Sequence, residues 1–224
     1  MIIFFDNNYN TQKTNPKMLK RWDTLSTFVG QICAGRDESH GYEHMKTVAE
    51  TSRRIVLEDF GPDEHELLTD AITVAWLHDV ADHKYDHDGK LTATLDEFGL
   101  EHIPNFSDIK KVIKLVSFSS ENKAILAGKP LDYEELLGEH YAKVRHIVSD
   151  ADKLEAIGAI GVIRAIQYTT HANPGSTEEQ IIDDVKKHAE EKLLRLAGEF
   201  IRTPYGKREA QVRHNEMVQQ LADL

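Results

Sequence analysis

The stretch AITVAWLHDVADHKY, residues 71–85, decides how the rest of the chain is interpreted. Its first seven residues are apolar apart from Thr73, which is typical of a buried helix. His78 and Asp79 then stand side by side at the end of that helix. Burying either side chain without a partner is costly, and imidazole nitrogen and carboxylate oxygen are both metal ligands. The stretch therefore predicts a helix that carries two ligand groups into the interior.

The composition limits the classes of protein to which the chain can belong. Its 224 residues are enough for one sizeable domain or two small ones, and its hydrophobic content of 40% is ordinary for a folded protein. The net charge of −11 argues against a surface for duplex nucleic acid, which needs clustered lysine and arginine. Small phosphorylated substrates are still compatible with this charge, because a bound metal supplies positive charge locally.

Cysteine content and the distribution of apolar residues predict a cytoplasmic protein. Cys33 is the single cysteine, so we expect neither an intrachain disulfide nor a zinc–thiolate cluster. The first residues, MIIFFD, contain a short apolar run with no basic region before it, unlike a signal peptide. No apolar stretch approaches ~18 residues, so we expect no membrane-spanning segment.

Apolar residues recur at helical spacing along most of the chain, and period-two alternation is almost absent. We expect an all-α fold with one compact domain over residues 18–224, preceded by a flexible N-terminal arm at residues 1–17. Residues 82–89 are expected to form a loop, and residues 117–120 to lead away from the helix before them. The expected helices span residues 18–33, 41–59, 64–80, 91–98, 108–117, 141–168, 177–201 and 207–221.

Side chains of ligand type occur on three of these helices: His44, His78 with Asp79, and an aspartate at position 150 or 152. His44 lies four residues before Val48, which places it on the inward face of its helix, and His40 lies one turn earlier. Imidazoles combined with carboxylates suit zinc, manganese, iron or nickel. Four protein ligands leave coordination positions open, as a catalytic metal needs in order to bind water.

The order His, His-Asp, Asp, spread over helices, resembles the HD superfamily of metal-dependent phosphohydrolases. The resemblance is closer still to its small bacterial YpgQ-like and YedJ-like members, and it extends from about residue 18 to the C-terminus. The Asp-Ala-Asp-Lys-Leu segment makes it more specific than the His-Asp pair alone. The matching segments are HGYEHMKTV (40–48), LHDVAD (77–82), SDADKLEAIGAIG (149–161), HAEEKLL (188–194) and AQVRH (210–214).

The resemblance implies that one divalent metal ion, manganese, nickel, iron or zinc, is held by His44, His78, Asp79 and Asp152. Asp152 is preferred to Asp150, because superfamily members place this ligand just before a basic residue and a leucine. Asp150 would then lie behind the ligands. On its own, each of these residues also has a simpler explanation: His44 as a hydrogen-bonded core histidine, for example, and Asp152 as a helix cap or ion-pair partner.

The chain departs from the family pattern at two positions. The family usually has aspartate after the first histidine of the HGYEH segment, whereas this chain has Gly41, which leaves the orientation of His40 open. The family usually has arginine before the valine of that segment, whereas this chain has Thr47, with Lys46 one place earlier. The second departure puts one phosphate contact in question.

Such a resemblance implies hydrolysis of a phosphate ester or anhydride in a nucleotide. The metal would bind a substrate oxygen and a water, lower the pKa of that water from ~15.7 toward ~7, and allow hydroxide to attack phosphorus in line. Asp79 and Asp82 would be the catalytic carboxylates, with Asp82 orienting the water or acting as base. The candidate substrate contacts, whose simpler explanation is exposure to solvent, are His40, Lys84, Lys153 and Lys192.

Several functions are compatible with these residues. Release of pyrophosphate from a nucleoside triphosphate is favoured, and release of phosphate from a nucleoside 5′-monophosphate is the alternative, because both need the same metal. A non-catalytic binding module of the same fold is a third reading. Cyclic-nucleotide and alarmone hydrolases usually carry further domains or a second metal set, which a short chain disfavours. We expect a small phosphorylated partner, no duplex nucleic acid and no membrane, and leave a homodimer open.

Overall fold

The computed structural model describes residues 16–36 and 40–224, and across this part of the chain it contains helices and no strand. The predicted all-α fold is therefore confirmed. The predicted arm lies outside the described residues except for Pro16 and Lys17, which open the first helix. The helices are α1 (Pro16–Ile32), α2 (Tyr42–Asp59), α3 (His65–Leu77), α4 (Lys90–His102), α5 (Phe106–Val116), α6 (Phe118–Leu126), α7 (Tyr133–Glu155), α8 (Ala159–Ala172), α9 (Glu178–His188) and α10 (Pro204–Ala222), with short π-helical segments η1 (Ala189–Leu193) and η2 (Leu196–Phe200) between α9 and α10.

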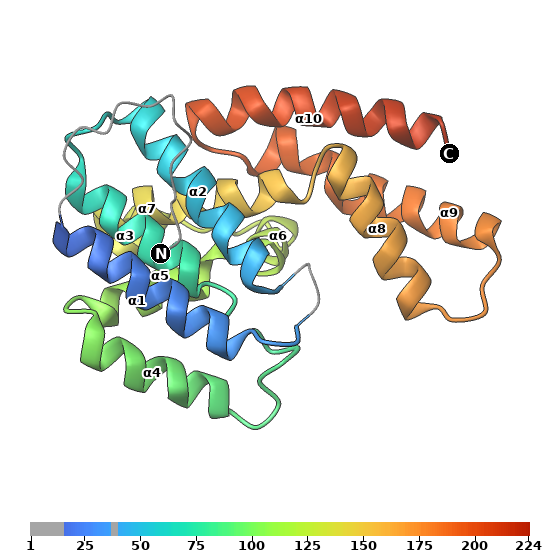
Figure 1. The fold of residues 1–224 in the computed structure, drawn as a ribbon. Coiled ribbons are helices and arrows are strands. Elements are labelled where there is room, and N and C mark those ends of the chain that lie inside the picture. Colours follow the sequence, from blue (N-terminus) through green and yellow to red (C-terminus); the bar gives the residue numbers. More distant parts are fainter. Residues whose placement is uncertain (1–15, 37–39) are drawn as a thin grey trace.

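The central element is α3, which packs against α1, α2, α5 and α7. Every residue from Asp70 to Leu77 is buried, as expected for a helix that is apolar on all faces. In Figure 1, α10 runs across the top of this body, and α8 and α9 form a hairpin that projects from it, while α4 lies along the opposite edge. The C-terminal end of α3, which carries His78 and Asp79, therefore lies between α2 and α7 in the interior.

The long helix expected over residues 141–168 is in fact two helices. The first, α7, begins earlier, at Tyr133, where the Asp132 side chain accepts hydrogen bonds from two backbone N–H groups. It ends at Glu155, and α8 starts at Ala159. The chain turns at Gly158, whose φ of 89° lies in the left-handed region that favours glycine. Apolar spacing continues through this corner, which is why periodicity alone did not show it.

The segment 117–120, expected to lead away from its helix, instead begins α6. Ser117 has an extended conformation, with φ −56° and ψ 129°, and helix resumes at Phe118. Only one residue separates the two helices. Because the residues around it are polar, the sequence resembled a loop. The expected helix over 177–201 is present as α9 followed by η1 and η2. The other helices agree with expectation to within about one turn at each end.

The redirected helix α6 places Glu121 at the centre of a buried charge cluster. Its carboxylate is 2.7 Å from Nη2 of Arg145, 3.3 Å from Nζ of Lys153 and 3.1 Å from Nη2 of Arg202. Glu121, Arg145 and Lys153 are almost fully buried. Burial raises the pKa of Glu121, but its three cationic neighbours outweigh that effect and hold the pKa below its usual value. This charge cluster around Glu121 links α6 and α7 to the segment that precedes α10.

Asp150 makes a second connection between α7 and α10. Its carboxylate accepts hydrogen bonds from the backbone N–H groups of Arg202 and Thr203. The hydroxyl of Thr203 in turn accepts from the N–H of Gly206 at 3.1 Å and so caps the start of α10. Burial raises the pKa of Asp150 to about 6, even though these hydrogen bonds favour the charged form.

None of the described helices combines the length and apolarity that crossing a bilayer would require.

We expect the close packing of the α7–α8 corner to make Gly161 sensitive to substitution. A Cβ at Gly161 would lie 2.3 Å from the carbonyl oxygen of Ala156, whereas a Cβ at Gly198 would meet nothing within 4 Å. Gly161→Ala should lower the free energy of unfolding by about 1–3 kcal/mol because the backbone must move. Gly198→Ala should change it by less than about 1 kcal/mol. Urea unfolding followed by circular dichroism measures both, and equal effects would contradict the packing described.

Candidate metal centre

Four side chains from α2, α7 and the end of α3 converge on one point. The Nε2 atoms of His44 and His78 are 3.3 Å apart. Oδ2 of Asp79 lies 3.6 Å from each of these nitrogens. Oδ1 of Asp152 lies 3.6 Å from Nε2 of His44 and 3.9 Å from Nε2 of His78. Both histidines are buried, and both aspartates are partly exposed, so the cluster has an inner and an open side.

These separations fit a single metal ion. Ligands about 2.1 Å from one ion are about 3.0 Å apart when they meet at a right angle and about 4.2 Å apart when they lie opposite each other. The distance between the two imidazole nitrogens and the four distances from those nitrogens to the carboxylate oxygens fall within that interval. The donor set of two imidazoles and two carboxylates suits a divalent transition metal such as manganese, iron, nickel or zinc.

The outer nitrogens of both imidazoles have partners that orient the rings. Nδ1 of His78 donates to the carbonyl oxygen of Ala75 at 2.8 Å, and a carbonyl can only accept. Nδ1 of His44 is hydrogen-bonded to the carboxylate of Glu155. Each Nε2 therefore faces the common point, which is the arrangement of a metal-ligating histidine.

Electrostatics at the cluster favour a positive charge. Burial disfavours the imidazolium form of His44, but the carboxylates of Asp79, Glu155 and Asp152 outweigh burial and raise the pKa of His44 to about 10. Burial also raises the pKa of Asp79, whereas His78 and His44 lower it, and the result is a pKa below the usual value. Without a metal, a proton on His44 supplies the positive charge that these carboxylates favour, and a bound cation would take its place.

His40, Asp82 and Lys84 lie beside the cluster, on its open side. One ligand atom of His40, one of Asp82 and one of Asp79 lie within 4.8 Å of one another. Nζ of Lys84 is 3.1 Å from Nε2 of His40, and the backbone N–H of Lys84 donates to the Asp82 carboxylate at 2.8 Å. The turn that follows α3 therefore brings a carboxylate and an ammonium next to Asp79.

Lys192 and Lys153, the two other predicted substrate contacts, have different surroundings. Lys192 lies in η1, with Nζ 5.1 Å from the centre of the Phe118 ring. Burial lowers the pKa of Lys192, while Asp152 raises it, so its ammonium is within electrostatic reach of the cluster. Lys153 points into the interior, where its ammonium contacts Ser149 and Glu121. The structure brings Lys192 toward the cluster and does not bring Lys153 there.

Residues that the sequence interpretation missed support the cluster. Arg36 donates from Nη1 to the carbonyl of Asp79 at 2.9 Å and from Nη2 to that of Val80 at 2.6 Å, which holds the turn after α3 in place. Glu155 contacts His44, as described above. Glu155 lies three residues after Asp152 on α7, so helical spacing would have placed both on one face. No local pattern in the sequence indicated Arg36, because its contacts are to residues more than 40 positions away.

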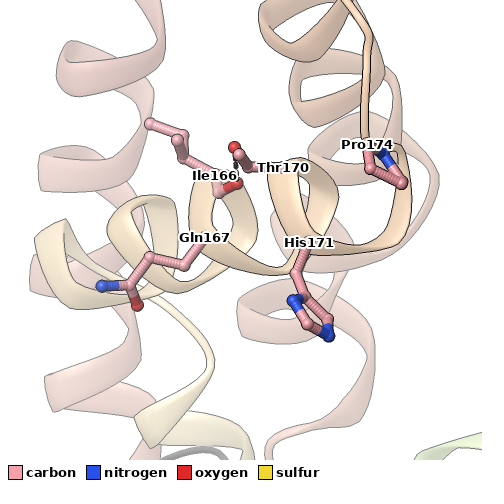
Figure 2. Close-up of a pocket in the computed structure, with 5 residues that line it drawn as sticks. All are labelled: Ile166, Gln167, Thr170, His171 and Pro174. Carbon is pink, nitrogen blue, oxygen red and sulfur yellow. Dashed lines mark hydrogen bonds between the residues drawn. The ribbon is translucent and has the colours of Figure 1, made fainter.

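Two other features of the described residues do not offer a comparable set of free metal ligands. Figure 2 shows a hollow formed by the C-terminal half of α8 and Pro174, in which His171 is the only titratable side chain. Glu66, Asp70 and His140 also come together, but Asp70 is already engaged by His140 at 3.0 Å and by Asn105 at 3.0 Å. This second group forms a link between α3 and α7.

Comparisons with known proteins agree with this geometry. No protein-family model matches the chain. It is 29% identical over 213 residues to the uncharacterized protein YpgQ of Bacillus subtilis (strain 168), covering 93% of this chain and 94% of YpgQ. The crystal structure of an HD-superfamily hydrolase from Bacillus thuringiensis matches with a TM-score of 0.57 and 24% identity, over 92% of this chain and 95% of that one. The chain therefore has the HD-type helical fold.

Within that fold, the resemblance to YpgQ extends over nearly the whole chain. The crystal structure of Bacillus subtilis YpgQ in complex with ADP matches with a TM-score of 0.65 and 22% identity, over 92% of this chain and 94% of that one. A protein from Lactobacillus plantarum matches with a TM-score of 0.68 and 24% identity, over 91% and 94% of the two chains. The chain is YpgQ-like in fold.

Metal binding should release a proton near neutral pH. Because the pKa of His44 is about 10 without metal, the imidazole carries a proton at pH 7.5 that a cation must displace. Titrating Mn²⁺ into chelator-treated protein should release about one proton per ion, and the affinity should rise about tenfold per pH unit between about pH 6.5 and 8.5. Calorimetry in buffers of different ionisation enthalpy measures the number of protons. Binding without proton release would contradict this account of His44.

Proposed function

We propose that this chain is a divalent-metal-dependent phosphohydrolase that acts on nucleotides and releases pyrophosphate from nucleoside triphosphates. The observation that carries the proposal is the convergence of His44, His78, Asp79 and Asp152 at separations suited to one ion. The HD-type fold shared with a hydrolase supports it, as does the binding of ADP by YpgQ. These relatives support a hydrolase that recognises a nucleotide polyphosphate.

A metal held by these four residues would supply Lewis-acid charge and bring the pKa of water toward ~7. The chain's own residues account for the remaining requirements. Asp82 has a side chain that is 18% exposed and lies beside Asp79, where its carboxylate can orient an attacking water and accept its proton. His40, next to Lys84, lies where it can contact the phosphate group under attack. Arg36 keeps the backbone of this turn rigid through its two carbonyl contacts.

Two lysines are suited to bind the phosphates of the substrate. Lys84 is on the turn after α3, on the side of His40, and Lys192 is on η1, on the side of Asp152. Among the described residues, Lys192 forms no ion pair, and its ammonium faces the Phe118 ring. A half-buried ammonium without a carboxylate partner favours a bound anion. Two lysines beside one metal fit a di- or triphosphate better than a monophosphate. Lys153 is not included, because Glu121 already neutralises it.

The proposal predicts metal-dependent release of pyrophosphate. Purified protein should be assayed against nucleoside mono-, di- and triphosphates with manganese, nickel or zinc, beside Asp79→Ala and the exposed control Asp63→Ala. We expect pyrophosphate from triphosphates with wild type and with Asp63→Ala. Asp79→Ala should lose at least about 100-fold in rate, because a ligand is gone. Phosphate released only from monophosphates would replace the proposed substrate class, and equal rates for wild type and Asp79→Ala would overturn the proposed site.

The two lysines should contribute to substrate binding. Lys192→Met should raise KM for a nucleoside triphosphate about 10–100-fold, because a charge-assisted contact to phosphate contributes about 1.5–3 kcal/mol. The exposed Lys187→Met on α9 is the matched control and should behave as wild type. Steady-state kinetics at saturating manganese measure both variants. A KM for Lys192→Met equal to that of Lys187→Met would remove Lys192 from the phosphate site.

A further inference from the structure

The carboxylate of Glu155 connects His44, in the candidate metal centre, to Arg164 on α8. Glu155 is the last residue of α7, and its side chain is 11% exposed. One carboxylate oxygen, Oε2, is hydrogen-bonded to Nδ1 of His44. The other, Oε1, accepts from Nη2 of Arg164 at 2.9 Å. Both oxygens are therefore used, and the carboxylate has little freedom to turn away from the imidazole.

Arg164 holds Glu155 at two points. Besides its contact with the carboxylate, its Nη1 lies 3.4 Å from the carbonyl oxygen of Glu155. Arg164 lies on α8, and its side chain reaches Glu155 because the chain turns at Gly158. Gly161 allows the close approach, since a Cβ there would collide with the backbone of Ala156. The tight corner between α7 and α8 therefore places the guanidinium of Arg164 beside Glu155, at the end of α7.

The two imidazoles differ in the partners of their outer nitrogens. His78 donates to the neutral carbonyl of Ala75, whereas His44 faces the charged carboxylate of Glu155. A carboxylate on Nδ1 orients the ring and raises the basicity of Nε2, which strengthens its bond to a metal. Losing such a partner typically costs 10–100-fold in metal affinity. His44 should therefore be the stronger imidazole donor of the two.

We propose that Glu155, held by Arg164, is a positioning residue that sets the metal affinity of the centre through His44. The inference rests on metal binding by the cluster, as the proposed function does, but on no particular substrate. Glu155 itself is placed to touch neither substrate nor reacting atoms. Its effect should appear in the affinity for the ion and in the state of the His44 ring.

The affinity can be measured with Mn²⁺ alone on chelator-treated protein, from the electron paramagnetic resonance signal of the free ion. Glu155→Ala should weaken binding about 10–100-fold. Glu155→Gln, which keeps the size and one acceptor oxygen, should lose less than Glu155→Ala, and Arg164→Met should lose up to about tenfold. The exposed Glu199→Gln is the control and should bind as wild type. Unchanged affinity in both Glu155 variants would overturn the proposal.

A second readout separates this role from general stabilisation. In zinc-loaded protein, which is diamagnetic, wild type should show a far-downfield proton resonance from the His44 Nδ1–H bonded to a carboxylate. Glu155→Ala should lose that resonance while the corresponding His78 signal stays. Loss of affinity with the His44 resonance intact would mean that Glu155 acts only on the fold, and would overturn the proposal.

The outcomes also separate this inference from the proposed function. If Glu155→Ala binds Mn²⁺ as tightly as wild type and nucleotide hydrolysis persists, the positioning role fails and the function stands. If the Glu155 variants lose affinity as expected and no nucleotide is hydrolysed, the function fails and the positioning role stands. If wild type binds no Mn²⁺, Ni²⁺ or Zn²⁺, both are wrong.

Discussion

The structure depends on bringing two imidazole lone pairs and two carboxylates to one point inside a helical fold. Such an arrangement favours a positive charge, because carboxylates of Asp79 and Asp152 lie 3.6 Å from the buried Nε2 of His44. A proton on His44 or a divalent cation satisfies it. The surrounding contacts keep these groups together: Ala75 and Glu155 orient the rings, and Arg36 holds the turn that carries Asp79. These contacts fix the orientation of the groups that meet in the cluster.

Helix α7 has different partners on two of its faces, and this difference fixes the position of Asp152. One face presents Asp152 to the histidines. The next residue, Lys153, is directed at buried Glu121, which also binds Arg145 and Arg202. Removing one member of such a buried network leaves an uncompensated charge, which costs several kcal/mol. Rotation of α7 would break that network, so the position of Asp152 beside the histidines is held by charges that lie outside the cluster.

Charge is distributed unevenly in this acidic chain, with two lysines close to the cluster. The net charge of −11 is spread over the molecule. Near the cluster, however, Lys84 and Lys192 place ammonium groups beside its aspartates, from segments more than 100 residues apart in sequence. Lys192 lies in a π-helical segment, an irregularity that often occurs at functional sites. The electrostatic field near the cluster therefore depends on these local groups as well as on the net charge.

The sequence alone determined the helical class, the inward position of His44 and the burial of the helix ending at His78, because apolar spacing is a local property. It also placed Asp150 and Asp152 on one helix, and the family resemblance favoured Asp152 as the ligand. Only the tertiary structure decided that Asp152 faces the histidines while Asp150 binds backbone near α10, and that Lys153 is buried. The partnership of Glu155 with Arg164 needed it too. These outcomes depend on which helices meet across the fold and on the turn at Gly158, and neither is encoded in short-range periodicity.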